Sequence, residues 1–174
     1  MVHTVFVLSI YRCKNMKLIF YKGYDIISKI IQFFTKSDYA HVGLYITEES
    51  SEPMVYESKD FYGVRCVPIS YYKNYDGEVW LADIFPQPDI PQLLKSVKWN
   101  LNQPYSWAEI VVLFFRIVFK IRIPYHVSRT EYICSEYVAT KLDECGVAIV
   151  PWPELVTPAE LAKSLFITKW TRLS

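Results

Sequence analysis

The chain has 174 residues, of which 52% are apolar and 21% charged, so we expect one globular domain and exclude a disordered chain. Its 19 basic and 18 acidic side chains leave a net charge of +1, a balance that predicts no nucleic-acid partner. The four cysteines are scattered without a zinc-binding spacing, and the start lacks the features of a secretory signal. We therefore expect a reduced, cytoplasmic protein with no metal or cofactor.

The chain begins with two predicted strands and a helix. Apolar, β-branched runs predict strands at 2–10 and 17–21. Residues 25–34 then carry apolar side chains at helical spacing. This pattern predicts an amphipathic helix whose solvated face bears Lys29 and Gln32.

A hairpin is predicted next. Residues 40–46 alternate as a strand does, which places His41 on the face opposite the core. Gly43, on the same face, permits the close approach of a neighbouring backbone. A polar turn leads to 54–58, the expected antiparallel partner, with Glu57 near its end. Further strands are predicted at 63–69 and 78–83.

The second half of the chain is predicted to be helical. Apolar spacing of the helical kind covers 90–101, 107–123 and 132–142. Gly146 follows the last of these helices as a stop signal. A short final helix begins with Thr157 as its N-cap and Glu160 as the partner in a capping box.

Residues 107–123 form the most apolar segment and are about as long as a membrane span. Four charged residues interrupt it, which favours a buried or partly buried helix over a transmembrane one. A helix that lies on a membrane surface is the alternative, because Arg116 and Lys120 are four positions apart and share one face.

Cys134 lies at the start of the 132–142 helix and is our candidate nucleophile. Unpaired backbone N–H groups and the positive end of the helix dipole lie at this position. Both favour the thiolate, which is the reactive form of cysteine. The alternative is that Cys134 is a small buried apolar residue, as many free cysteines are.

A nucleophilic cysteine needs a base, and the base needs an orienting group. His41 is the preferred base because a strand can aim its imidazole, whereas His3 and His126 occupy less defined positions. Glu57 is the preferred orienting residue, since its strand should pair with that of His41. Its rivals, both in turns, are Asp38 and Glu48.

Four blocks of sequence carry a family resemblance: 37–45 (SDYAHVGLY), 55–58 (VYES), 63–65 (GVR) and 132–138 (YICSEYV). In this order they resemble the circularly permuted papain-like branch of the NlpC-type cysteine peptidase superfamily. That branch has YiiX-like and poxviral members and, as a more distant relative, lecithin retinol acyltransferase. The resemblance spans about residues 17–162. One departure is that 22–25 (KGYD) stands where these proteins have a Gly-Asp dipeptide before an apolar strand.

The resemblance implies an α+β fold, with residues 1–174 as one circularly permuted papain-like domain whose antiparallel sheet packs against helices. It implies Cys134 as nucleophile, His41 as base and Glu57 as third polar residue, in agreement with the choices made above. We therefore expect a cysteine hydrolase or acyltransferase, a thiol protease, amidase or lipid esterase, that forms a thioester with a peptide, lipid or small-molecule substrate. The alternative is a non-catalytic binding module on the same scaffold, associated with a membrane surface.

Overall fold

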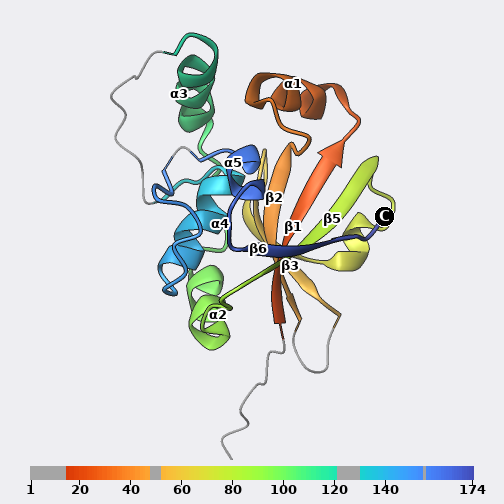
Figure 1. Cartoon of the computed structure of the whole chain (residues 1–174), viewed down its shortest axis with the longest axis vertical. Coiled ribbons are helices and arrows are strands. Elements are labelled where there is room, and N and C mark those ends of the chain that lie inside the picture. Colours follow the sequence, from red (N-terminus) through yellow and green to blue (C-terminus); the bar gives the residue numbers. More distant parts are fainter. Residues whose placement is uncertain (1–14, 48–51, 121–129, 155) are drawn as a thin grey trace, which may run out of the picture.

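The structure is a computed structural model, and it describes residues 15–47, 52–120, 130–154 and 156–174. It has an α+β fold in which six antiparallel strands form one sheet, in the spatial order β4-β3-β2-β1-β5-β6 (Figure 1). The strands are β1 (Asn15–Gly23), β2 (His41–Thr47), β3 (Met54–Lys59), β4 (Gly63–Pro68), β5 (Gly77–Ile84) and β6 (Ile167–Arg172). The helices are α1 (Ile26–Thr35), α2 (Ile90–Trp99), α3 (Trp107–Val118), α4 (Cys134–Asp143) and α5 (Pro158–Ala162), with a 3-10 turn at Ile69–Tyr72.

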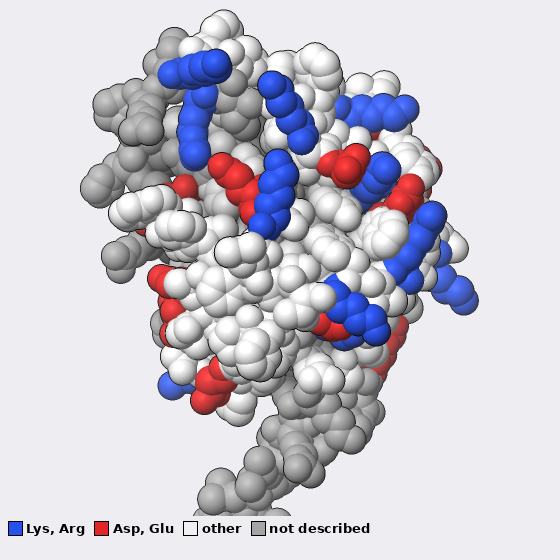
Figure 2. All heavy atoms as spheres, viewed as in Figure 1, with Lys and Arg blue, Asp and Glu red and all other residues white. Residues whose placement is uncertain are grey.

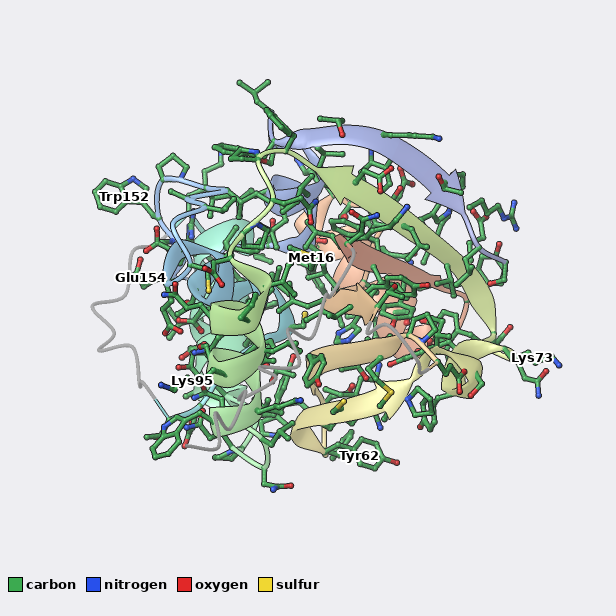
Figure 3. All side chains as sticks on the ribbon, turned by 90° about the horizontal axis from the view of Figure 1, so that it is seen from below. Met16, Tyr62, Lys73, Lys95, Trp152 and Glu154 are labelled. Carbon is green, nitrogen blue, oxygen red and sulfur yellow. The ribbon has the colours of Figure 1, made fainter. Side chains whose placement is uncertain are left out.

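The main core lies between one face of the sheet and α4 and α2, and its centre comes from alternate residues of the two middle strands. Figure 3 shows Met16 of β1 between the sheet and the helices, where it is fully buried. A smaller cluster covers the other face of the sheet, and Tyr21 and Tyr72 belong to it. Because β1 and β2 are buried on both faces, neither can shift its register without exposing apolar side chains.

Most predicted elements agree with the structure to within about two residues, and two do not. The β6 strand was missed because it is a half-exposed edge strand whose sequence, ITKWTR, is mostly polar. The predicted 107–123 helix is too long, since α3 ends at Val118 and Lys120 adopts a left-handed backbone (φ 55°). The predicted 2–10 strand lies outside the described residues.

Helices α1 and α3 lie together at one end of the molecule, the upper end in Figure 1. Phe34 of α1 and Phe114 of α3 meet edge to face, with ring centroids 5.0 Å apart. Within the described residues, every helix is too short or too polar to cross a bilayer.

Candidate active site

The beginning of α4 is inserted against β2 and β3. The ladder between these strands ends nearby, at the pair Leu44 and Tyr56. The backbone N–H of Val42 donates a hydrogen bond to the sulfur of Cys134. From β3, the hydroxyl of Ser58 donates to the carbonyl of Tyr132 at 2.6 Å. The first residue of α4 is therefore held between two strands.

This insertion brings the three sequence-predicted residues together. Cys134 begins α4 and forms a side-chain hydrogen bond with His41, the first residue of β2. The Nε2 atom of His41 lies 2.8 Å from Oε2 of Glu57 on β3. Cys134 and His41 are each 6% exposed, whereas Glu57 is fully buried. The three side chains thus form one continuous chain of polar contacts where α4 meets the two strands.

Gly43 allows the close approach of β2 to Glu57. A Cβ atom at this position would lie 3.2 Å from Cβ of Glu57 and 3.2 Å from the carbonyl oxygen of Tyr56. These separations are tighter than ordinary side-chain contacts, so any larger residue would push the two strands apart. The glycine expected from the sequence to permit close approach is therefore placed beside the residue that contacts His41.

Glu57 is an ionised carboxylate, although it is completely buried. Burial by itself would raise its pKa, but His41, Tyr72 and Arg65 outweigh burial and lower the pKa to about 2. Arg65 Nε donates to Oε1 of Glu57 at 2.9 Å, and the hydroxyl of Tyr72 donates to the same oxygen. Because a carboxylate only accepts hydrogen bonds, Nε2 of His41 must carry its proton, which leaves Nδ1 as the basic nitrogen.

Cys134 and His41 shift each other toward an ion pair. Burial raises the pKa of the Cys134 thiol, but the charge and hydrogen bond of His41 and the N–H of Val42 bring that pKa below its ordinary value. Burial likewise lowers the pKa of His41, and the charges of Cys134 and Glu57 more than reverse this effect. The arrangement therefore favours a thiolate beside an imidazolium.

Four residues near this site were given no role from the sequence. Arg65 and Tyr72 hold the far oxygen of Glu57, and Lys59 lowers the pKa of Cys134 by its charge. The pKa of Tyr105 is raised, mainly by burial and next by the nearby charge of Cys134. Only Arg65 had a usable signal, because it lies on the next predicted strand after that of Glu57, and the structure pairs the two residues directly.

A buried pair of carboxyl groups lies behind the first turn of α4. Glu136, in that turn, accepts a hydrogen bond from the backbone N–H of Ile133 and also faces Glu109 of α3. Burial is the main cause, and Glu109 the next, of a rise in the Glu136 pKa to about 10. Oε2 of Glu136 and both carboxyl oxygens of Glu109 have no donor within the structure. A proton held between the two carboxyl groups supplies the missing donor.

The rival candidates from the sequence are not part of this arrangement. Asp38 is exposed in the turn before β2. Glu48, His3 and His126 lie outside the described residues.

A groove in the described part of the chain is lined by none of the three residues. It has a volume of about 890 Å³ and runs between α3, the 148–156 segment and α5. Its lining includes Val112, Trp152 and Phe166, with the charged side chains of Arg116 and Glu160. It is linked to the site through Val156, whose carbonyl accepts a hydrogen bond from the hydroxyl of Ser135.

Comparison with known proteins identifies the fold. The chain is similar in structure to the metalloprotein YiiX from Escherichia coli O157:H7, with a TM-score of 0.52 and 20% sequence identity. The match covers 94% of this chain and 98% of that chain. No protein-family model and no curated protein matches the chain in sequence. The chain therefore has a YiiX-like α+β fold, with a six-stranded antiparallel sheet packed against helices.

The similar structure is that of a metalloprotein. Across residues 15–47, 52–120, 130–154 and 156–174 of this chain, no three His, Cys, Asp or Glu side chains are grouped so that they could hold a metal ion.

Proposed function

We propose that the protein is a cysteine hydrolase or acyltransferase that cleaves an amide or ester bond through a thioester intermediate. In this proposal Cys134 is the nucleophile, His41 the base and Glu57 the orienting residue. The proposal also takes residues 1–174 as one circularly permuted papain-like domain, in which the histidine strand precedes the cysteine helix. The observation that carries it is the polar chain from Cys134 through His41 to the ionised, fully buried Glu57.

The first half of the reaction forms the thioester. Nδ1 of His41 takes the proton of the thiol, and Sγ of Cys134 attacks the carbonyl carbon of the substrate. The carbonyl π electrons move onto oxygen, which accepts hydrogen bonds from the backbone N–H of Cys134 and from a second donor. The hydroxyl of Tyr105 is our candidate for that donor. The amine or alcohol then leaves with the proton from His41, and the acyl group stays on Sγ.

The second half releases the acyl group. Water, or an acceptor amine or alcohol, gives a proton to Nδ1 while its oxygen or nitrogen attacks the thioester carbonyl. The C–S bond breaks, and Sγ leaves as a thiolate beside the imidazolium. Throughout the cycle Glu57 keeps the proton on Nε2 and stabilises the charged ring.

The decisive experiment measures the rate of Cys134 alkylation by iodoacetamide against pH, with each cysteine followed by peptide mass spectrometry. We expect a midpoint well below about 8.5, the pKa of a free thiol, and a shift back toward that value in His41→Ala. The partly exposed Cys66 and Cys145 serve as internal controls. The midpoint is the readout because it reports the pKa of the thiol, whereas the absolute rate also depends on how accessible the buried Cys134 is to the reagent.

A midpoint for Cys134 at or above that of Cys66 would contradict the proposal and favour a binding module that lacks chemistry. A reactive Cys134 leads to turnover assays with amide and lipid-ester substrates, in which Cys134→Ala must abolish the activity while the fold is kept. Activity that survives in Cys134→Ala would assign the chemistry elsewhere.

A further inference from the structure

Large apolar side chains are exposed at the end of the molecule where α1 and α3 lie. Apart from Trp107 at the start of α3, the large apolar side chains exposed on these two helices and on the residue that caps α3 are Ile26 (77%), Ile30 (50%), Phe33 (77%), Val111 (55%), Val118 (39%) and Phe119 (55%). We term these six residues the apolar cap. Monomeric soluble proteins rarely expose a continuous apolar surface of this kind without a partner for it.

Helix α1 exposes three of its apolar residues. Ile26, Ile30 and Phe33 follow one another at helical spacing and are all exposed, whereas the polar Ser28 is buried. The sequence predicts a solvated face with Lys29 and Gln32, and of these two residues Lys29 is exposed whereas Gln32 is only partly exposed. The amide of Gln32 donates to the carbonyl of Gly23 at 3.1 Å. The outward face of α1 is therefore a surface suited to an apolar environment.

The apolar cap is one surface and adjoins the candidate active site. The contact between Phe34 and Phe114 joins α1 to α3. The surface continues at the start of α3, where the half-exposed Trp107 meets the exposed Phe61 with ring centroids 5.1 Å apart. Tyr105 lies two residues before Trp107, and the charge of Cys134 adds to the effect of burial in raising the pKa of Tyr105. The chain after α1 leads directly to His41 at the start of β2.

The charges around the apolar cap are mostly positive. Lys29, Lys36 and Lys120 are exposed on and beside the two helices. Figure 2 shows Lys and Arg side chains around this upper end, with uncharged side chains between them and acidic side chains beside the lower ones. Asp25 and Asp38 are the exposed acidic residues next to α1, and Arg116 of α3 is paired with Glu160 of α5 at 3.6 Å. The acidic residue of α3, Glu109, is fully buried.

We propose that this end of the protein docks on the surface of an anionic phospholipid bilayer. The apolar cap enters the boundary between headgroups and acyl chains, and the three lysines lie among the anionic headgroups. Two separate helices that project from one end, with apolar side chains outward and lysines beside them, match an interfacial surface better than a second copy of the chain, which would bring the same lysines together. Docking in this way holds Cys134 close to the lipid, and it does not depend on the proposed chemistry.

The test is co-sedimentation of the full chain with vesicles of phosphatidylcholine mixed with phosphatidylserine, compared with phosphatidylcholine alone. We expect binding to the mixed vesicles and a loss of about tenfold or more in the partition constant of Phe33→Glu. The matched control is Trp99→Glu, which adds the same charge at an 86% exposed aromatic residue on the distant α2 and should bind as the wild type does. Phe114 is not a suitable target, because its loss would separate the two helices.

A second pair of variants tests the lysines. Lys29→Gln and Lys36→Gln should each weaken binding to the mixed vesicles by about fivefold, with little change on phosphatidylcholine alone. Cys134→Ala should bind as the wild type does, so a failure of the proposed chemistry leaves this result unaffected. The proposal is overturned if the wild type does not sediment with mixed vesicles, or if Trp99→Glu loses as much binding as Phe33→Glu. A lipid-free dimer that Phe33→Glu dissociates would also overturn it, by showing that a second copy covers the cap.

Discussion

Glu57 and Arg65 lie directly opposite each other on β3 and β4, and Nη2 of Arg65 is 2.8 Å from Oε1 of Glu57. The guanidinium takes one oxygen of the fully buried carboxylate and leaves the other oxygen for His41. The orientation of the imidazole is therefore supported from a third strand, through the contact of Arg65 with Glu57.

Arg65→Met should destabilise the protein strongly, because it removes one partner of a buried ion pair and leaves a buried charge. We expect a loss of about 3 kcal/mol in the free energy of unfolding, measured by urea denaturation. The matched control is Lys17→Met, which removes a half-exposed ion pair with Asp83 at 2.7 Å. That change should cost at most about 1 kcal/mol, and equal losses in the two variants would contradict the role given to Arg65.

Glu57 should make the stability depend on pH in the acid range. Its pKa is about 2 in the folded protein against 4.5 ordinarily, so its contribution is present above pH 4.5 and is lost as the pH falls toward 2. Glu57→Gln should be less stable at neutral pH and should lose this part of the acid dependence. Urea unfolding at a series of pH values checks the prediction. An unchanged acid dependence in Glu57→Gln would show that other carboxyl groups cause it.

Glu136 should have the opposite effect on stability. Its folded pKa of about 10 lies above the ordinary 4.5, so stability is lost as the pH rises between these two values. Glu136→Gln keeps a neutral hydrogen-bonding side chain and should gain up to about 3 kcal/mol at pH 7, where the wild type must hold a proton on a carboxyl group. Asp143→Asn, at the exposed end of the same helix, should change stability by less than about 0.5 kcal/mol. If Glu136→Gln does not raise the free energy of unfolding at pH 7, the proton shared between Glu136 and Glu109 is contradicted.

Substitutions of Gly43 and Gly146 should distinguish an effect on protein stability from an effect on the reactivity of Cys134. Gly43→Ala should push Glu57 away from β2, cost about 1–3 kcal/mol and move the alkylation midpoint of Cys134 upward. Gly146→Ala should also cost about 1 kcal/mol, because φ is +80° there, although its Cβ would meet no atoms. Gly146 follows the far end of α4, so the Cys134 midpoint should stay unchanged. A shift of equal size in both variants would mean that reactivity follows global stability.

Local patterns in the sequence were enough to predict most of the fold. The alternation in β2 and β3 and the helical spacing of α4 depend on neighbours close in the chain, and the structure has these elements at the predicted places. The weak points were segments whose environment differs from the usual one. The edge strand β6 has too few apolar residues to be recognised from its sequence. Ile26, Ile30 and Phe33 of α1 were expected inside but are exposed.

The sequence by itself determined which residues have the chemical character for a cysteine site: a thiol at a helix start, an imidazole at a strand start, and a carboxylate on the expected neighbouring strand. Their catalytic roles stay a prediction. Only the tertiary structure decided that Arg65 and Tyr72 hold Glu57, that Tyr105 approaches Cys134, and that Glu109 meets Glu136. These contacts join segments far apart in the chain, and their electrostatic effects depend on burial, which no local pattern specifies.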